Sequence, residues 1–349
     1  MQRFNLSLVR TDGGEWANSD TQKANALAEH FANVFKPYNS VMSEAEEQEI
    51  LHALETLGQL KTPVKKFKLT EVWTAIHQLR PKKTPGYDLI TGRILKEQPD
   101  IGIWAITQIF NSVLRTVYFP GQWKVSQIIT ILKPGKPAEE AKSYRPISFL
   151  PILSKLCEKL FLTRIQPTLQ EKGIIPDHQF GFRQKHATIE QVHRITNVIH
   201  NALESNKYCT AAFLGISQVF DKAWHEGLLY KIKTGFSDST YKILKSYLEN
   251  RYFLIKYMEE YTSLHPVPSG VPQGSILDPL LYLIYTTDLP TTSDSTTATF
   301  ADDTAVLTIR ENPAIATHRL QTNLNEIQLW LKNGVWRSLK QSQSKLPLP

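Results

Sequence analysis

Cysteine is scarce in this chain: Cys157 and Cys209 are its only two thiols. Two thiols cannot build a disulfide framework, and they cannot supply the four thiolates of a common structural zinc site. No apolar run reaches the length of about 18 residues that a membrane-spanning helix needs. The first residues also lack the long apolar segment of a secretory signal. These absences predict a soluble intracellular protein with no membrane partner.

The composition is that of a folded protein. Hydrophobic residues make up 41% of the 349 positions, charged residues 21% and aromatic residues 10%, which excludes a disordered or fibrous chain. The 40 basic and 33 acidic side chains leave a net charge of +7. That balance favours polyanionic partners such as nucleic acid. The length allows one large domain or several subdomains.

Helical periodicity and strand-like runs alternate along the chain, which predicts an α+β fold. Apolar spacing predicts helices that begin near Ser19, Ser43 and Thr70, the second of them with a Ser43–Glu46 capping box and an end at Gly58. A last helix is expected from Asn312 or Pro313 to Asn333.

Two runs are expected to be strands. Residues 125–132 are rich in β-branched side chains and precede a turn. Residues 208–216 carry apolar side chains on both faces, which predicts a strand in the centre of its sheet.

Basic residues gather at two turns. The first is Lys82-Lys83-Thr84-Pro85-Gly86, which is rigid at Pro85 and permissive at Gly86. The second belongs to a hairpin flanked by Lys133, Lys136 and Arg145. Such a hairpin can grip a triphosphate or a nucleic-acid backbone, but a solvated basic loop has the same composition.

Two further segments have the composition of ligand-binding loops. Residues 178–183 alternate aromatic with polar and basic side chains, which suits stacking on bases and contact with phosphate. Residues 270–275 contain two glycines that let backbone approach a ligand closely, and Gln273 adds an amide.

An acidic hairpin is predicted near the C-terminal end. β-favouring runs at residues 296–299 and 305–309 flank the sequence Phe300-Ala301-Asp302-Asp303-Thr304. This arrangement presents two adjacent carboxylates at a hairpin tip. Adjacent aspartates alone would fit an ordinary turn, because Asp is a good turn former.

Taken in order, five motifs resemble the successive motifs of a reverse transcriptase. The residues in these motifs are most similar to those of non-LTR retrotransposons of the jockey type. The resemblance extends from about residue 16 to about residue 332. The motifs are Tyr144-Arg145-Pro146-Ile147-Ser148, Gln179-Phe180-Gly181-Phe182-Arg183, Val219-Phe220-Asp221-Lys222-Ala223-Trp224-His225, residues 270–275 and Phe300-Ala301-Asp302-Asp303.

The resemblance implies a right-hand polymerase with an antiparallel palm sheet packed on helices. Residues 1–80 would form an N-terminal helical extension and residues 81–205 the fingers-like part. Residues 206–310 would form the palm with its catalytic hairpin. Residues 311–349 would form a terminal helix and a degenerate tail, so that the thumb is largely missing.

The resemblance also implies a chemistry. The family joins a primer 3′-hydroxyl to the α-phosphate of a dNTP while copying an RNA template, with a DNA primer or target as the other strand. Two Mg²⁺ ions, which Mn²⁺ can replace, assist this reaction. Asp302 and Asp303 would be the catalytic, metal-binding acids. The other implied contacts are Arg145 and Lys133 to the triphosphate, Phe220 beneath the sugar, Gln273 and Gly274 at the nucleotide and template, and Phe182 and Arg183 on nucleic acid.

This sequence departs from the family pattern at several positions. Gly215 occupies the place of an aspartate that bridges both metal ions, and Asp221 lies too far along the chain to replace it. Asp278 stands where the family has glycine. After Asn333 the sequence reads like an out-of-frame tail in place of the family's continuation, and a counterpart of the family's N-terminal endonuclease domain is not expected. These departures predict a truncated, catalytically impaired copy, with binding of metal ions weakened.

Two alternatives stay open at this point. A non-catalytic remnant could still bind nucleic acid through its basic fingers, and an inert relic would do neither. The sequence carries no signal for an oligomeric state, for the identity of the RNA, or for a nuclear rather than a cytoplasmic location.

Overall fold

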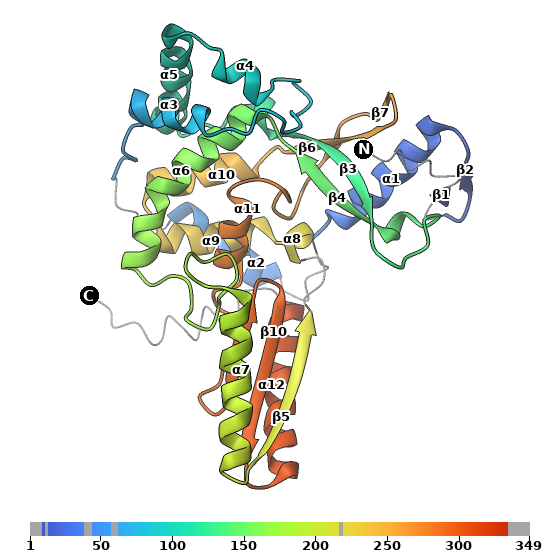
Figure 1. Ribbon diagram of the computed structural model, residues 1–349, viewed down its shortest axis with the longest axis vertical. Coiled ribbons are helices and arrows are strands. Elements are labelled where there is room, and N and C mark those ends of the chain that lie inside the picture. The colour runs from blue at the N-terminus through green and yellow to red at the C-terminus, as the bar shows by residue number, and fades with distance from the viewer. Residues whose placement is uncertain (1–8, 11–12, 38–43, 57–61, 216–218, 334–349) are drawn as a thin grey trace.

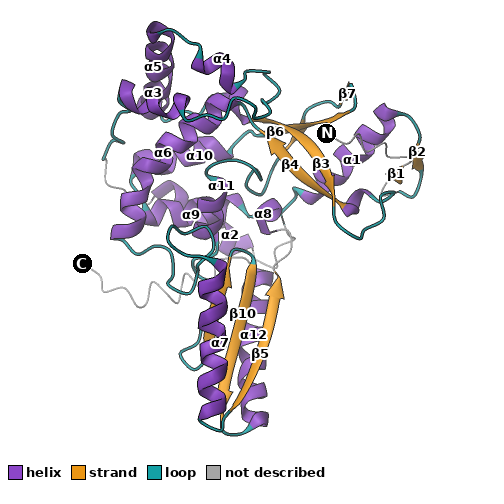
Figure 2. Ribbon diagram, in the orientation of Figure 1, coloured by secondary structure: helices purple, strands orange, loops and turns teal. Residues whose placement is uncertain are grey.

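The computed structural model describes residues 9–10, 13–37, 44–56, 62–215 and 219–333 of the chain. A broad helical body carries a twisted mixed sheet on one side (Figure 1). A narrower sheet with a long helix on each face projects away from the body (Figure 2). The expectation of an α+β fold is therefore confirmed. The predicted elements at Ser43 and Gly58 and the tail after Asn333 lie outside the described residues.

Helices make up most of the body. Ser19 caps the first of them, which begins where the sequence predicts, and the structure adds a capping box with Gln22. The helices are α1 (Asp20–Val34), α2 (Glu44–Thr56), α3 (Leu69–His77), α4 (Gly92–Lys96), α5 (Asp100–Thr116), α6 (Ile152–Glu171), α7 (Thr188–Glu204), α8 (Val219–Lys222), α9 (His225–Gly235), α10 (Asp238–Leu248), α11 (Asp278–Tyr285) and α12 (Pro313–Asn333).

The strands belong to three sheets, of which one is a short pair. That pair is β1 (Val9–Arg10) with β2 (Trp16–Ala17). The mixed sheet holds β3 (Val125–Leu132), β4 (Tyr144–Phe149), β6 (Tyr252–Tyr257), β7 (Glu260–Tyr261) and β8 (His265–Pro266), and the narrow sheet holds β5 (Tyr208–Gly215), β9 (Thr296–Phe300) and β10 (Asp303–Arg310).

The mixed sheet joins segments that are far apart in the sequence. Its order is β4-β3-β6-β7, with β8 also paired to β6. The β3–β4 hairpin is antiparallel, whereas β3 and β6 run parallel. Residues 252–266, expected in the palm part, thus complete the sheet that residues 125–149 begin. Helix α1 packs on this sheet through Leu27 and Phe31, near Phe253.

The narrow sheet has the order β5-β10-β9 and is antiparallel throughout. The prediction that residues 208–216 form a central strand is wrong, because β5 is an edge strand and β10 is central. Helix α7 covers one face of the sheet and α12 the other (Figure 2). Within β5, Ala212 and Leu214 pack toward α12, whereas Tyr208 and Phe213 are exposed, so the apolar run does not reflect burial of both faces.

Alternate residues of β10 face the two covering helices. Ala305 and Leu307 pack toward Ile195 and Ile199 of α7. Val306 packs with Leu320, Ile327 and Trp330 of α12. Because successive side chains point to opposite faces, this packing fixes the register of β10. It therefore also fixes where the first residue of β10 lies.

The body has its own core. The largest apolar cluster joins α3, α5, α6, α9, α10 and α11, with Phe110, Leu156, Leu228 and Leu281 among its most buried side chains.

No helix in the described part of the chain combines the length and apolar character needed to cross a membrane.

Candidate active site

The acidic pair lies at the turn between β9 and β10, at the end of the narrow sheet that meets the body (Figure 1). Ala301 and Asp302 form the turn, and Asp303 is the first residue of β10. Both carboxyl side chains are exposed. Ala301 has a φ of +55°, a left-handed conformation that alanine seldom adopts. The surrounding structure must therefore hold this turn in place.

Gly215 lies beside the acidic pair. It ends β5, and the register of the sheet places it directly opposite Asp303. A Cβ atom added to Gly215 would meet no other heavy atom within 4 Å. The position therefore has room for a side chain, but glycine supplies no ligand atom there.

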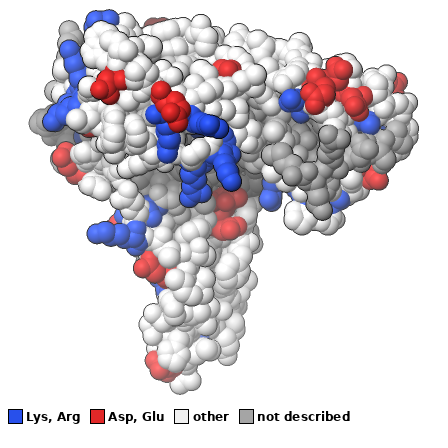
Figure 3. All heavy atoms as spheres, turned by 45° about the horizontal axis from the view of Figure 1, so that its top comes forward, with Lys and Arg blue, Asp and Glu red and all other residues white. Residues whose placement is uncertain are grey.

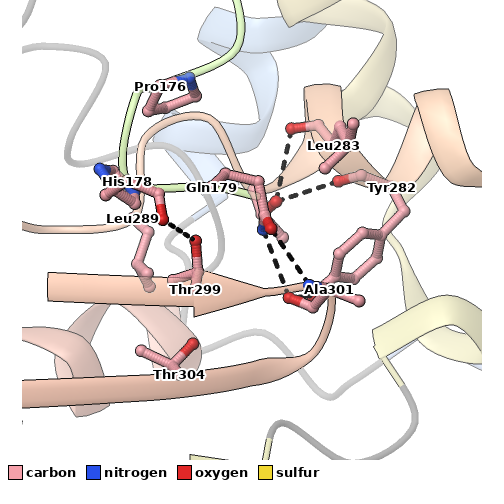
Figure 4. Close-up of a pocket in the computed structure, with 10 residues that line it drawn as sticks. Pro176, His178, Gln179, Tyr282, Leu283, Leu289, Thr299, Ala301 and Thr304 are labelled. Atoms are coloured by element: carbon pink, nitrogen blue, oxygen red, sulfur yellow. Dashed lines mark hydrogen bonds between the residues drawn. The ribbon is translucent and has the colours of Figure 1, made fainter. Parts of the chain in front are cut away.

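The loop after α6 clamps the hairpin turn from the other flank (Figure 4). Gln179 is buried, and its Oε1 accepts hydrogen bonds from the N–H groups of Ala301 and Gly181 at 3.1 and 2.8 Å. Its Nε2 donates to the Ala301 carbonyl at 3.3 Å. Gly181 approaches so closely that an added Cβ would lie 2.1 Å from the Ala301 nitrogen. Only glycine permits this contact.

Helix α11 completes the clamp. The Tyr282 hydroxyl donates to the Ala301 carbonyl at 3.0 Å. Burial raises the pKa of Tyr282, and the charges of Asp302 and Asp303 raise it further, so the hydroxyl remains a donor. The cavity between loop, helix and hairpin is about 10 Å³, room for about one water. This contact is packed and leaves no space for a ligand.

The sequence did not indicate that Gln179 and Tyr282 position the turn. Gln179 stands in a motif that the sequence analysis singles out, and Tyr282 lies on a helix predicted from its apolar spacing. However, the partner of the Gln179 amide is 122 positions away. No pattern along the chain indicates such a distant contact with backbone.

The rings of Phe220 and Phe182 pack against the Tyr282 ring. The Phe220 and Tyr282 rings stack with centroids 4.1 Å apart and an interplanar angle of 13°. Phe182 meets both rings edge-on at 6.1 and 6.3 Å, and it is 51% exposed. Because Tyr282 contacts the hairpin turn, these two predicted site residues lie next to the acidic pair.

Arg183 makes contacts within its own loop. Its Nη1 donates to the carbonyls of Pro176 and Gln179, both at 3.1 Å. The guanidinium thus supports the backbone that carries Gln179.

A second group of predicted residues surrounds Asp221, which lies within the short helix α8. Burial raises the pKa of Asp221 to about 6, and the Gln273 Nε2 donates to its Oδ1 at 2.7 Å. Burial lowers the pKa of Lys133, the Arg145 charge lowers it further, and the Asp221 charge opposes both. These side chains therefore share one electrostatic environment.

The loop of residues 270–277 is held against β4. Gly274 has a φ of +103°, and a Cβ there would lie 2.8 Å from the Ser148 carbonyl oxygen. The Ser148 N–H donates to the Gln273 carbonyl at 3.1 Å. Glycine is therefore required at Gly274 by both conformation and space.

Asp278, the departure on α11, is a buried acid. Its N–H donates to the Ser275 Oγ at 2.9 Å, whereas its own Oδ1 has no hydrogen-bond partner among the described residues. Burial raises its pKa to about 8. A carboxyl in this place is costly unless it is protonated.

The site lacks a complete set of metal ligands. Across the described ranges, no cluster of three or more His, Cys, Asp or Glu side chains is placed to hold a metal ion. Asp302 and Asp303 supply carboxylate oxygens, which Mg²⁺ prefers, but the third position at Gly215 supplies none. The residues present therefore do not fit a site for two ions.

Exposed carboxylates at a hairpin, with basic and aromatic side chains in the surrounding loops, are typical of proteins that handle phosphates and nucleotides. Residues 131–347 match the family model described as reverse transcriptase (RNA-dependent DNA polymerase). The chain belongs to this family, whose members are RNA-directed DNA polymerases, and the resemblance seen in the motifs is confirmed.

The chain is also similar in sequence to RNA-directed DNA polymerases of mobile elements. In Drosophila melanogaster, the chain is 41% identical to the probable RNA-directed DNA polymerase from transposon BS, over 96% of this chain and 38% of the relative. It is 39% identical to the RNA-directed DNA polymerase from mobile element jockey, over 94% and 36%. It is 42% identical to the probable RNA-directed DNA polymerase from transposon X-element, over 84% and 33%. The chain thus spans less than two-fifths of each of these relatives.

Proposed function

We propose that this chain is the template-copying part of a non-LTR retrotransposon polymerase whose catalytic site has lost one metal-ligand position. Its substrates are an RNA template, a DNA primer or target, and dNTPs. The observation that carries the proposal is the pairing of Gly215 with Asp303. It supports the identification of Gly215 as the lost acid of the first palm strand.

The expected subdomains are proposed in the same terms. The narrow sheet is the palm, and residues 81–205 supply most of the fingers. Strands β6 to β8, from the palm segment of the sequence, extend the fingers sheet because they pair with β3. Residues 1–80 are the N-terminal helical extension, and residues 311–349 are the terminal helix and tail.

The nucleotide is proposed to lie between the two groups of site residues. Lys133 and Arg145 bind its triphosphate, and the Phe220 ring, stacked on Tyr282, lies under its sugar. The Gln273 amide is engaged with Asp221. This supports a nucleotide contact through the backbone at Gln273 and Gly274. Phe182 and Arg183 lie on the template side.

Catalysis is proposed to be impaired because the metal site is incomplete. Two divalent ions, if bound, would supply activation of the primer hydroxyl and charge compensation for the leaving pyrophosphate. Asp221 does not substitute for the missing acid, since its carboxylate is buried and bonded to Gln273. Asp302 and Asp303 are proposed to bind Mg²⁺ or Mn²⁺ only weakly by themselves.

Primer extension on an RNA template tests the proposal. We expect Gly215→Asp to extend the primer with Mg²⁺ at least about a hundredfold faster than the unmodified chain, because it restores a metal ligand. The matched control is Gly215→Asn, which has the same size without the charge. Rapid extension by the unmodified chain would refute the impairment. No extension by Gly215→Asp would refute the assigned position.

A second candidate function is nucleic-acid binding without catalysis. The retained basic side chains around Lys133 and Arg145 favour it, because phosphate contact does not require the lost acid. Binding of RNA that weakens steeply with salt, together with no extension by either chain, would support this candidate.

A further inference from the structure

The narrow sheet has one edge that the described residues leave open. Its strand order is β5-β10-β9, so β5 has a partner strand only on its β10 side. The opposite edge is closed by the loop that contains His178 and Phe180. The Thr299 N–H of β9 donates to the His178 carbonyl, and the Phe180 N–H donates to the Thr299 carbonyl, both at 2.9 Å. An open strand edge offers N–H and C=O groups to a further strand.

The sequence of β5 has none of the features that prevent an edge strand from pairing. Residues 208–215 include no charged side chain and no proline. The strand is eight residues long, and its register with β10 continues from Tyr208 to Gly215 without a bulge. Edge strands of soluble proteins are usually short or carry charges, prolines or bulges, which block association. The edge of β5 is therefore suited to pair with another strand.

Exposed aromatic side chains lie on β5 itself. Phe213 is 72% exposed and Tyr208 is 54% exposed. Phe213 is opposite Ala305 in the sheet, and Ala305 packs toward α7. Because residues opposite each other point to the same face, the Phe213 ring lies on the α7 face of the sheet.

Helix α7 adds exposed apolar side chains on the same side of the sheet. Gln191 marks the β9 side of the helix, because its Nε2 donates to the carbonyls of His178 and Thr299. Ile195 and Ile199 come next around the helix and face the sheet. Continuing in the same direction, at about 100° per residue, leads to the flank nearest β5. This flank carries the exposed side chains Ile189, Val192 and Leu203.

Helix α12 has an uncharged flank toward β5. Arg319 lies on its other flank, because its Nε pairs at 3.7 Å with Asp294 in the segment that leads into β9. Beyond the buried row that includes Leu320 and Ile327, the flank nearest β5 carries Thr317, Gln321, Gln328 and Leu331. Figure 3 shows few charged side chains on the narrow part of the molecule in the face that it presents. The open edge is therefore largely uncharged on both faces.

The apolar area at this edge is close to that of a dimer interface. The exposed apolar side chains each expose roughly 100 Å²; they are Ile189, Val192, Leu203, Tyr208, Phe213 and Leu331. Together with the strand backbone they approach the area of about 800 Å² that each partner buries in a stable dimer. Exposed apolar area of this size marks an interaction site.

A second copy of this chain also fits the spacing of the helices on the α12 face. Adjacent strands lie about 4.8 Å apart, and α12 packs on both β10 and β5 through Val306, Ala212 and Leu214. When two β5 strands pair about a two-fold axis, the two α12 helices lie about 10 Å apart. Helices pack against each other at about this distance.

The α7 face leaves room for the Phe213 rings. Helix α7 packs on all three strands, from Ala298 of β9 to Cys209 of β5, and is thus centred over β10. Two α7 helices related by the same axis lie about 14 Å apart, which is wider than the packing distance of helices. The two Phe213 rings lie between them and occupy this space.

We infer that two copies of this chain associate through their β5 strands, which pair antiparallel about a two-fold axis. The shared sheet has the order β9-β10-β5-β5-β10-β9, and each β9 edge is closed by its own loop, so association stops at a dimer. Because the Gly215 end of β5 meets the body, the two bodies lie at opposite ends of the shared sheet. Pairing requires neither metal ions nor catalysis and is therefore independent of the proposed function.

Sedimentation velocity of the full chain over a range of concentrations tests the pairing. We expect a dimer, and Phe213→Asp should raise its dissociation constant at least about tenfold. This substitution removes two rings from the interface and places two like charges there, while its effect on folding should be small because Phe213 is exposed. The matched control is Trp104→Asp, which changes an exposed aromatic side chain on α5 of the body. It should leave the dissociation constant unchanged.

A second pair of variants tests the α7 flank. Leu203→Asp should weaken the dimer roughly fivefold, because it places a carboxylate in the apolar interface. Asn201→Asp is the control, since it adds the same charge to the same turn of α7 on the flank away from β5. It should leave the dimer intact. If both α7 variants weaken the dimer equally, the flank nearest β5 is not in the interface, and the inference is wrong.

Hydrogen exchange distinguishes a second copy from other strands that could cover the edge. In a dimer, protection of the outward-facing amides of residues 208–215 rises with protein concentration and is lost in Phe213→Asp. A monomeric chain with unprotected β5 amides would refute the inference. A monomer whose β5 amides are protected at every concentration would refute it too, because residues of the same chain would then cover the edge. A dimer that both Phe213→Asp and Leu203→Asp leave intact would show that the copies associate through another face.

Discussion

The two flanks of the acidic hairpin differ sharply. On one flank, the Gln179 and Tyr282 side chains hydrogen-bond to the Ala301 backbone, and Gly181 lies so close to it that no side chain could be added there. On the other flank, Gly215 faces open space beside Asp303. The contacts that hold the hairpin turn are close-packed, whereas the position proposed to have lost a metal ligand is a glycine in open space. On this proposal, a substitution on the open flank removes a ligand atom with little cost to the fold.

The largest expected effect is a difference in stability between glycine-to-alanine substitutions on the two flanks. Gly181→Ala should destabilise the protein by about 3 kcal/mol or more, because the added methyl group meets rigid backbone at Ala301. Gly215→Ala should change stability by less than about 0.5 kcal/mol. Chemical denaturation of both variants measures the difference. Equal effects would show that the hairpin is not clamped on one side only.

The second prediction concerns Asp278, the buried acid at the start of α11. Because burial raises its folded pKa to about 8, the folded state holds this proton over a range where the unfolded state has released it. Stability is therefore greatest below the unfolded pKa and falls as pH rises toward 8, by at most about 1.4 kcal/mol per pH unit.

Asp278→Asn should remove most of this slope and stabilise the protein at pH 7 and above. Denaturation midpoints across the pH range measure it. Asp221, whose pKa is raised to about 6, leaves a residual slope of the same sign. A pH profile that Asp278→Asn does not alter would show that Asp278 is not buried as a neutral acid.

The third prediction compares how much Gln179 and Tyr282 each stabilise the hairpin turn. Gln179→Leu leaves the amide and carbonyl of Ala301 without this partner and should cost about 2 kcal/mol, whereas Tyr282→Phe removes one hydrogen bond and should cost about 1 kcal/mol. Both variants should speed amide exchange in the hairpin turn. Gln184→Leu, an exposed position of the same loop, is the control. If it matches Gln179→Leu, the loss reflects the loop rather than the clamp.

Much of the fold follows from local patterns. Residues 125–132, the hairpin around Asp302 and the helix from Pro313 occur where apolar spacing and turn residues predict them. The central position expected for β5 was wrong because an apolar run does not reveal whether both of its faces are buried or what lies on the strand's edge. The parallel pairing of β3 with β6 joins residues more than a hundred positions apart and has no local signal.

The site was predictable to a similar extent. The motif order identified the family, and Gly215 lies beside Asp303 in the sheet. The clamp was not predictable, because its target is the backbone of Ala301 in a left-handed conformation. Alanine at that position gives no indication of positive φ, as glycine would, so the need for Gln179 and Tyr282 appears only in three dimensions.

The smallest expected effect returns to the open flank. Gly215→Asp places a third carboxylate next to two others, so it should lower stability slightly without metal, by less than about 1 kcal/mol, through like-charge repulsion. Mg²⁺ should reverse this loss, since an ion that binds only the folded state stabilises it. Thermal midpoints with and without Mg²⁺ measure the effect. Gly215→Asn should show neither change. If Mg²⁺ raised the thermal midpoint of the unmodified chain by the same amount, Asp302 and Asp303 would bind the ion without a third ligand. The glycine at position 215 would then not be the cause of weak metal binding.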